Sequence, residues 1–192
     1  MKQRSGKFIM VAGPSGSGKG TLIEYARTVF PHLARPVTST TRAPRPGEEE
    51  GVHRFFLSPE EFQQRIAENF FLEWAEYGGH LYGTSYDSVV PLVQRGEFVL
   101  KELEVQGVRQ VIATMPAAEV VTIFIDAGSW DSMEARIRAR APISEEELKK
   151  RKERYEDEMS FKAHADIIIS NKNGELEQAK KDFEDAVRSI IS

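Results

Sequence analysis

Short apolar runs and longer amphipathic stretches alternate along this chain. Four runs rich in β-branched and aromatic residues predict buried strands, at Phe8–Ala12, Phe98–Glu104, Val120–Asp126 and Asp166–Ser170. Helical periodicity in the intervals predicts helices at Thr21–Val29, Ser58–Asn69, Ser85–Arg95, Val105–Thr114, Ser129–Ala141, Ser144–His164 and Glu175–Ile191. Strands that alternate with helices are typical of an α/β fold around a parallel sheet, so we predict that fold class.

Two segments depart from this alternation. Residues 35–86 are rich in Thr, Arg, Pro, Gly and aromatic residues, which indicates an inserted antiparallel lobe. The helix at 144–162 begins with a predicted capping box, Ser144 and Glu147, and carries charge on nearly every face. Such a helix either projects from the body as a mobile element or lies as an ordinary solvated helix, and its charge pattern leaves both alternatives open.

The composition narrows the class of protein. The 192 residues fit one domain, and 40% hydrophobic with 29% charged residues is ordinary for a globular protein with a sizeable core. The absence of cysteine excludes disulfides, thiolate metal sites and a cysteine nucleophile. A net charge of −4 gives no electrostatic reason to expect nucleic acid as a partner. Residues 1–6 lack a signal-peptide core and no apolar run reaches membrane-spanning length, so we expect a soluble cytoplasmic protein without a membrane partner.

A glycine-rich loop follows the first predicted strand directly. It reads Gly13-Pro14-Ser15-Gly16-Ser17-Gly18-Lys19-Gly20-Thr21 and matches the G-x-x-x-x-G-K pattern between a strand and a helix. Glycines let successive backbone N–H groups surround phosphate oxygens, while the helix N-terminus and the Lys19 ammonium add positive charge. The loop therefore predicts a nucleoside triphosphate site. Gly20 stands where many such loops carry a magnesium-binding Ser or Thr, and Thr21 follows one step later, so the loop leaves its metal contact open.

Two arginines lie close together in the inserted lobe. Arg42 and Arg45 fall within TSTTRAPRPGEEEG, residues 38–51, among hydroxyl side chains and prolines. Guanidinium groups bind phosphate oxygens through two parallel hydrogen bonds, and hydroxyls add neutral donors. The same arginines could instead pair with the acidic run Glu48–Glu50. The residues alone leave these two alternatives open.

Several motifs, taken in order, resemble those of the guanylate kinases, which move the γ-phosphoryl group of ATP to GMP. The matching segments span almost the whole chain: GPSGSGKGT, TSTTRAPRPGE, FLEWAEYGGHLYGTS, VQG at 105–107, and RIRAR followed by SEEELKKR. The resemblance implies one domain with three parts. These are a parallel-sheet core at 1–34, 88–128 and 165–192, a GMP-binding lobe at 35–87, and a helical lid at 129–164.

The resemblance also implies roles for individual residues. The GMP phosphate would contact Arg42, Arg45 and Tyr82, and the guanine base would contact Thr38, Glu73, Thr84 and Glu104. ATP would bind to the loop residues 13–21 and to Asn171, and the catalytic residues would be Lys19, Arg42, Arg136, Arg140 and Arg151. Mg²⁺ would enter with ATP and be positioned by Glu102 and Thr21, directly or through water.

Elementary chemistry supports two of these assignments and leaves an alternative beside each. Guanine presents N1–H and its N2 amino group side by side, and one carboxylate such as Glu73 can accept from both, whereas adenine offers no such pair. Glu73 could otherwise be a solvated strand residue beside Trp74. Arg136 and Arg140 are four residues apart and share a helix face. They would suit the neutralisation of a transferred phosphoryl group, or else form a solvated basic face.

The chain departs from the family pattern at three notable positions. Glu102 and Glu104 stand where the family usually has Asp, and the alternation of side chains along a strand puts both on one face. Arg54 stands where the family usually has a tyrosine that donates to the GMP phosphate. We predict that Arg54 still faces the phosphate pocket.

The leading hypothesis is an active guanylate kinase of purine nucleotide metabolism, with ATP and GMP as partners and a monomeric or homodimeric state. The alternative is a kinase of the same fold that acts on another nucleoside monophosphate or small phosphorylated acceptor. A non-catalytic binding module is the least favoured hypothesis, because such modules typically lose the loop that this chain keeps at Gly13–Thr21.

Overall fold

The structure, a computed structural model, describes residues 6–192 apart from the side chain of Arg140. Residues 1–5, part of the start in which the sequence indicated no signal-peptide core, lie outside the described residues. The chain forms two compact units. The lobe unit comprises residues 6–8, 34–100 and 106–120, and the core unit comprises residues 9–33, 101–105 and 121–192. The glycine-rich loop thus belongs to the core unit, and the two lobe arginines belong to the lobe unit.

A four-stranded sheet in the order β6-β1-β7-β8 forms the predicted core. Strands β7 and β8 pair in parallel, with Ile125 opposite Ile169. The middle strands are buried on both faces, which is why they appear in the sequence as continuous apolar runs. The α/β fold class predicted from the alternation is confirmed. The strands are β1 (Lys7–Ala12), β6 (Phe98–Glu102), β7 (Val120–Asp126) and β8 (Ile167–Ser170).

Strand β6 ends at Glu102, two residues earlier than predicted. Leu103 still donates its backbone N–H to the carbonyl oxygen of Val11 at 3.0 Å, and its side chain is buried between the exposed Glu102 and Glu104. The alternation of side chains therefore continues past the strand. The prediction that Glu102 and Glu104 share an exposed side is compatible with this pattern, although Glu104 is not a strand residue.

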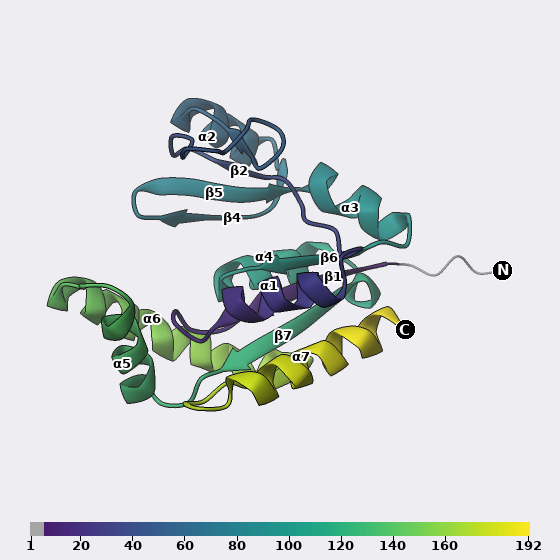
Figure 1. Ribbon diagram of the computed structural model, residues 1–192. Coiled ribbons are helices and arrows are strands. Elements are labelled where there is room, and N and C mark those ends of the chain that lie inside the picture. The colour runs from purple at the N-terminus through teal and green to yellow at the C-terminus, as the bar shows by residue number, and fades with distance from the viewer. Residues whose placement is uncertain (1–5) are drawn as a thin grey trace. The chain divides into compact units, whose positions relative to one another are not determined.

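Two helices of the core unit, α1 (Lys19–Val29) and α7 (Leu176–Ile191), pack against each other (Figure 1). Their buried positions recur at one-, three- and four-residue steps, so each helix presents a single apolar stripe. These positions are Leu22, Ile23 and Ala26 on α1, and Ala179, Phe183 and Val187 on α7. Within residues 6–192, no helix is both long enough and apolar enough to cross a bilayer.

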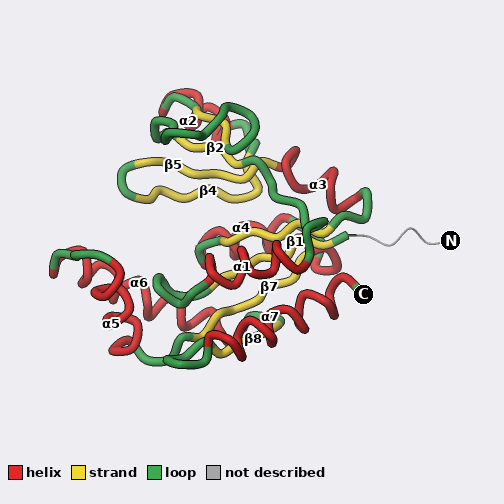
Figure 2. Tube along the Cα trace, viewed as in Figure 1, coloured by secondary structure: helices red, strands yellow, loops and turns green. Residues whose placement is uncertain are grey.

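A second four-stranded sheet, in the order β3-β2-β5-β4, builds the lobe unit (Figure 2). Its strands are β2 (Thr38–Thr40), β3 (Arg54–Phe56), β4 (Phe71–Tyr77) and β5 (His80–Ser85). Strand β5 pairs antiparallel with β2 and with β4, as predicted. Strands β2 and β3 are parallel, with Thr38 opposite Arg54, so the prediction of an antiparallel lobe is wrong at this pair. The reason is the loop at 41–53, which carries the chain back before β3 begins and gives both strands the same direction.

Three helices complete the lobe unit, α2 (Pro59–Ala67), α3 (Tyr86–Gln94) and α4 (Val105–Thr114), with a 3₁₀ turn at Ala117–Glu119. The Phe62 ring of α2 stacks on Phe71 of β4 at a centroid distance of 4.4 Å. Ser58 caps α2 with a complete capping box, because its hydroxyl accepts from the N–H of Glu61 and the Glu61 carboxylate accepts from the N–H of Ser58.

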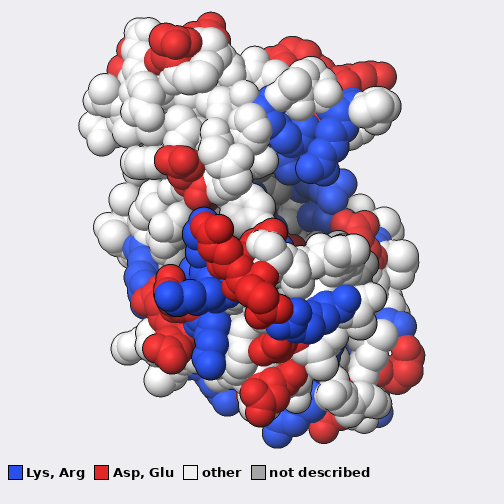
Figure 3. Space-filling model, turned by 90° about the vertical axis from the view of Figure 1, so that its left-hand side faces the viewer, with Lys and Arg blue, Asp and Glu red and all other residues white. Residues whose placement is uncertain are grey.

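The predicted lid segment contains α5 (Trp130–Arg140), α6 (Glu145–Ser160) and a 3₁₀ turn at Phe161–His164. Only half of the capping box predicted for α6 is formed. The Ser144 hydroxyl accepts from the N–H of Glu147, while the Glu147 carboxylate binds Arg151 instead. Figure 3 shows acidic and basic side chains next to one another over the lower part of one face of the molecule. The mobility of the lid stays a prediction.

Candidate active site

The glycine-rich loop adopts backbone angles that its glycines make accessible. Gly13 and Gly18 have φ values of 140° and 93°. A Cβ atom on Gly13 would lie 2.5 Å from the backbone oxygen of Ile125 on β7, and one on Gly18 would collide with the Asn171 amide. The loop therefore turns from β1 into α1 while packing directly on β7 and on the segment after β8. This close packing fixes the directions of its N–H groups.

Asn171, the residue after β8, binds the glycine-rich loop. Its side-chain Nδ2 donates to the Ser17 carbonyl oxygen at 2.7 Å, and its backbone N–H donates to the Asp126 carbonyl oxygen at 2.8 Å. Arg136 of α5 donates to the Asn171 carbonyl oxygen at 2.8 Å and to Asn173 Oδ1 at 3.0 Å. Asn171 is buried, with 4% of its surface exposed. The structure thus gives Asn171 a role in holding the loop, and brings Arg136 to the same place.

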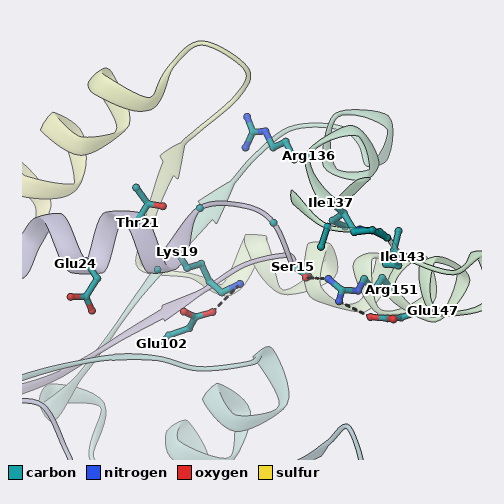
Figure 4. A pocket seen from close by; sticks show the side chains of 15 residues that line it. Ser15, Lys19, Thr21, Glu24, Glu102, Arg136, Ile137, Ile143, Glu147 and Arg151 are labelled. Carbon is teal, nitrogen blue, oxygen red and sulfur yellow. Dashed lines mark hydrogen bonds and ion pairs between the residues drawn. The ribbon is translucent and has the colours of Figure 1, made fainter. Parts of the chain in front are cut away.

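The Lys19 ammonium lies over the loop from the first turn of α1. Nζ donates to the carbonyl oxygens of Gly13 at 2.7 Å and Pro14 at 3.2 Å, and lies 3.5 Å from Glu102 Oε1 (Figure 4). The Lys19 side chain is 10% exposed, whereas that of Glu102 is half exposed. A positive charge held by carbonyl oxygens of the loop, beside the N-terminus of α1, is suited to receive an anion.

One cavity of about 990 Å³ joins these groups within the core unit. Lys19, Glu102, Arg136 and Arg151 line it together with loop residues and the apolar Ile137 and Ile143. Arg151 of α6 donates to the Ser15 hydroxyl at 3.0 Å and to Glu147 at 2.7 Å. The structure therefore brings three of the sequence-predicted cationic residues to one cavity. Arg140 lies at the end of α5, and its side chain lies outside the described part of the chain.

The side chains predicted to contact Mg²⁺ are not brought together. Figure 4 shows Thr21 and Glu102 on opposite sides of α1. A Cβ atom on Gly20 would lie 3.9 Å from Glu102 Oε2, so position 20 faces Glu102 and position 21, about 100° further round the helix, does not. Residues 6–192 also hold no cluster of three His, Cys, Asp or Glu side chains arranged for a metal. A Mg²⁺ ion held mainly by phosphates and water would fit this cavity, whose lining includes the Glu102 carboxylate.

In the lobe unit, the Arg42 guanidinium binds Glu48 with a two-bond fork. NH1 donates to Oε2 at 2.7 Å and NH2 donates to Oε1 at 2.6 Å, while the backbone N–H of Arg45 donates to Oε2 at 2.8 Å. These hydrogen bonds lower the pKa of the Glu48 carboxyl to about 2, and the bonds from Arg42 have the largest effect. They also raise the pKa of Arg42. Of the two alternatives left open by the sequence, the structure shows the pairing of Arg42 with Glu48, and the side chain of Arg45 is exposed.

Arg54 lies beside the same group. Its NH1 donates to the Thr38 hydroxyl at 2.7 Å, and its guanidinium carbon lies 5.8 Å from the centre of the Tyr82 ring. Its Nε lies 3.9 Å from Glu48 Oε1. Burial lowers the pKa of Arg54, and the positive charge of Arg42 lowers it further. These contacts form one group, the arginine cluster, which consists of Thr38, Arg42, Arg54 and Tyr82.

Glu73 and Thr84 form a buried pair on adjacent strands. The Thr84 hydroxyl donates to Glu73 Oε1. Thr84 is 0% exposed and Glu73 is 5% exposed. This burial excludes the alternative of a solvated strand residue at Glu73. Glu104, predicted to read the same base, belongs to the core unit and is exposed.

Helix α4 supplies support that the sequence interpretation missed. The Gln110 amide bonds both backbone groups of Trp74, at 3.0 Å to its N–H and 2.9 Å to its carbonyl oxygen. A Cβ atom on Gly107 would lie 2.9 Å from Glu73 Oε2, so a larger residue there would require the carboxylate to shift. A glycine inside a helix weakens that helix, and this was the available signal for a close approach at position 107.

The parallel sheet, the glycine-rich loop and the arginine-lined cavity define a P-loop nucleotide kinase fold. A family model described as guanylate kinase matches residues 5–190. A guanylate kinase of Rubrobacter xylanophilus is 41% identical over 189 residues, which cover 98% of this chain and 97% of the relative. One of Thermosynechococcus vestitus is 42% identical over 184 residues, covering 96% and 94% of the two chains.

The chain belongs to the guanylate kinase family. The fold agrees with this assignment. A crystal structure of guanylate kinase from Anaplasma phagocytophilum superposes with a TM-score of 0.68 at 24% identity, covering 96% of this chain and 86% of that one.

Proposed function

We infer that the protein transfers the γ-phosphoryl group of ATP to GMP, giving ADP and GDP. Family membership supports the reaction. The single observation that carries the choice of acceptor is the buried Glu73 carboxylate with Thr84 beside it. A buried carboxylate that finds two adjacent N–H donors on guanine, and none on adenine, discriminates between the bases because an unpaired buried charge costs free energy.

On the donor side, we propose that the N–H groups of the loop at 13–20 bind the ATP phosphates with Lys19. A phosphate oxygen of GMP attacks the γ-phosphorus, the bond from that phosphorus to the β–γ bridging oxygen breaks, and ADP leaves without a covalent enzyme intermediate. The reaction develops negative charge around the transferred group, so fixed cations are the main protein contribution. Lys19, Arg136 and Arg151 line the cavity from three elements and are suited to this role, and we assign Arg140 to the same task.

Mg²⁺ would supply charge neutralisation on the phosphates when bound with ATP, and we propose that Glu102 positions it through water. The half-exposed Glu102 carboxylate beside Lys19 supports this assignment. Thr21 is the weaker of the two candidates, because it faces the other side of α1.

On the acceptor side, we propose that Arg42, Arg45, Arg54 and Tyr82 hold the GMP phosphate. Thr38, Thr84 and Glu104 would join Glu73 around the base. The clustering of Thr38, Arg42, Arg54 and Tyr82 supports this division of roles. We also propose that the core at 1–34, 88–128 and 165–192, the lobe at 35–87 and the lid at 129–164 move as parts, and that closure excludes water that would hydrolyse ATP.

The substrate panel is the decisive experiment. Initial rates with ATP and Mg²⁺ would be measured for GMP, AMP, CMP and UMP at equal concentration. We expect GMP to be phosphorylated fastest. A higher rate with AMP, CMP or UMP would contradict the acceptor assignment and favour a kinase of the same fold with another substrate. Failure of ATP to bind in a calorimetric titration would instead indicate a non-catalytic module.

The cellular setting is also a proposal. We place the reaction in the cytoplasm and expect neither nucleic acid nor a membrane to take part. We expect a monomer or a homodimer, and sedimentation of the purified protein would distinguish these states.

A further inference from the structure

Strand β4 is irregular directly before Glu73. The register of β4 against β5 shifts between Phe71 and Glu73, so Leu72 is an extra residue that forms a β-bulge. In a regular strand Phe71 and Glu73, two residues apart, would share a face. The bulge places Glu73 on the other face, beside Thr84 and away from the stack of Phe71 on Phe62. It also disrupts the ladder of hydrogen bonds at this point of the strand.

Gln110 of α4 binds the strand immediately after the bulge. Its Nε2 donates to the Trp74 carbonyl oxygen at 2.9 Å, and its Oε1 accepts from the Trp74 N–H at 3.0 Å. Strand β4 lies at the edge of the four-stranded sheet, so the Gln110 amide takes the place of a neighbouring strand at this residue. Among side chains of this length, glutamine alone offers one donor and one acceptor side by side at neutral pH.

Gly107 lies one turn before Gln110 and faces the Glu73 carboxylate itself. A Cβ atom on Gly107 would lie 2.9 Å from Glu73 Oε2 and 3.5 Å from Glu73 Cδ. The Thr84 hydroxyl donates to the other carboxylate oxygen, Oε1. One oxygen of the carboxylate is therefore bound from β5, and the other lies against α4. We call Gly107 and Gln110 the α4 clamp, and both belong to the lobe unit together with Glu73.

We propose that the α4 clamp is a positioning element that sets guanine specificity, because it fixes the orientation of the Glu73 carboxylate. Gln110 holds the strand next to the bulge, and Gly107 leaves room for Oε2. The proposal rests on the proposed binding of GMP to the lobe. One carboxylate can accept from both N1–H and the N2 amino group only in a defined orientation, whereas a single hydrogen bond tolerates rotation.

Inosine monophosphate separates these two cases, because its base keeps N1–H and lacks the N2 amino group. A Glu73 carboxylate that has turned slightly can still accept from N1–H, so the clamp should matter for GMP and much less for inosine monophosphate. The informative quantity is the ratio of the two kcat/KM values. A general loss of folded protein lowers both values by the same factor and leaves their ratio unchanged.

The test measures kcat/KM for GMP and for inosine monophosphate at saturating ATP and Mg²⁺. We expect the wild type to prefer GMP by roughly 10- to 100-fold, the usual effect of one hydrogen bond to a charged group. Gln110→Met keeps the length of the side chain and removes both polar atoms, so it should lower this ratio by about fivefold. Gln63→Met changes an exposed glutamine of α2 and should leave the ratio within about twofold of the wild type.

Gly107→Ala tests the other residue of the clamp and does not depend on the folding of Gln110→Met. Alanine favours a helix more than glycine does, and the atom that the new Cβ would meet is the end of a flexible side chain. We therefore expect the variant to fold normally while the Glu73 carboxylate shifts, which should lower the ratio by about fivefold. A wild-type ratio in either Gln110→Met or Gly107→Ala would overturn the proposal.

Hydrogen exchange keeps this outcome separate from that of the proposed function. In the free protein, the Trp74 N–H should exchange with solvent about tenfold faster in Gln110→Met than in the wild type. An unchanged rate would overturn the proposal, because Gln110 would then not hold the strand. If the wild type phosphorylated neither nucleotide, the proposed function would fail, and calorimetric affinities for the two nucleotides would supply the ratio instead. Normal phosphorylation of GMP with unchanged ratios would contradict the role of the clamp alone.

Discussion

We propose that the glycine-rich loop and the arginine cluster both bind phosphate, but they are built in different ways. The loop consists of consecutive residues, and its donors are backbone N–H groups directed by Gly13, Gly16 and Gly18. The arginine cluster consists of side chains from β2, β3, β5 and the loop at 41–53, which are brought together by strand pairing. A site made of backbone is determined locally, whereas a site made of side chains depends on the register of distant strands.

The two sites also hold their cations differently. In the loop, Lys19 rests on two carbonyl oxygens and lies 3.5 Å from a half-exposed carboxylate. In the cluster, Arg42 has both terminal nitrogens bound to Glu48. Lys19 thus rests mainly on neutral carbonyl oxygens, while Arg42 is bound to a charged partner before GMP arrives. The loop should therefore control the chemical step and the cluster should control acceptor binding.

The largest effect is expected at the loop. Lys19→Ala should lower kcat by about 10³-fold, because Lys19 is the fixed charge nearest the transferred group. GMP affinity should stay within twofold of the wild type. Steady-state rates and calorimetric titration with GMP measure the two quantities. Lys149→Ala removes an exposed lysine of α6 and is the control. Near-normal turnover in Lys19→Ala would contradict the expectation that the loop controls the chemical step.

Backbone strain offers a second contrast. Gly13→Ala should destabilise the protein by about 3 kcal/mol, since the new Cβ would meet a backbone oxygen of β7 at a φ of 140°. Gly47→Ala, at a φ of 84° in the loop at 41–53, should destabilise it by only about 1 kcal/mol, because nothing lies within 4 Å of the new atom. Chemical denaturation of both variants measures the difference. Equal losses would show that close packing on β7 does not fix the loop.

The difference between a site of consecutive residues and a site made by strand pairing also explains how much the sequence could predict. The loop, its strand and its helix follow from adjacent residues, and the structure confirms their local form. The parallel pairing of Thr38 with Arg54 could not be foreseen, because it depends on how the loop at 41–53 turns. The acidic run at 48–50 was a visible partner for Arg42, but the turn that adds the Arg45 N–H selects Glu48. Periodicity places Gly107 and Gln110 on one face of a helix, yet only tertiary packing shows that this face lies against β4.

Glu73 tests the base site of the lobe unit. Glu73→Gln should lower kcat/KM for GMP by about 10²-fold, because an amide can accept from only one of the two guanine donors and presents its own N–H₂ to the other. Glu76→Gln changes an exposed carboxylate on the same strand and should leave kcat/KM unchanged. If both variants behaved alike, Glu73 would have no special part in reading guanine.

Glu48 tests whether Arg42 is held in place for GMP. Glu48→Gln should raise the KM for GMP about tenfold with little change in kcat, because the fork that orients Arg42 loses its charge. Glu49→Gln removes a neighbouring exposed carboxylate and is the control. The lowered pKa of Glu48 also predicts how its contribution to stability depends on pH. Its contribution to stability is complete above its ordinary pKa of 4.5 and is lost as the pH falls through about 2. A lower KM in Glu48→Gln would instead mean that Glu48 competes with the GMP phosphate.

Arg54 gives the smallest and most specific test, since it stands where the family usually has a tyrosine. Arg54→Ala should raise the KM for GMP by roughly fivefold, because it removes a guanidinium that lies beside Thr38 and Tyr82 but is not bound in a fork. Arg54→Tyr restores a hydroxyl donor and should keep the KM within about twofold of the wild type. An unchanged KM in Arg54→Ala would show that Arg54 serves the Thr38 contact and not the phosphate. A KM raised equally in both variants would show that the cluster needs the charge at this position, and that the two residue types are not equivalent here.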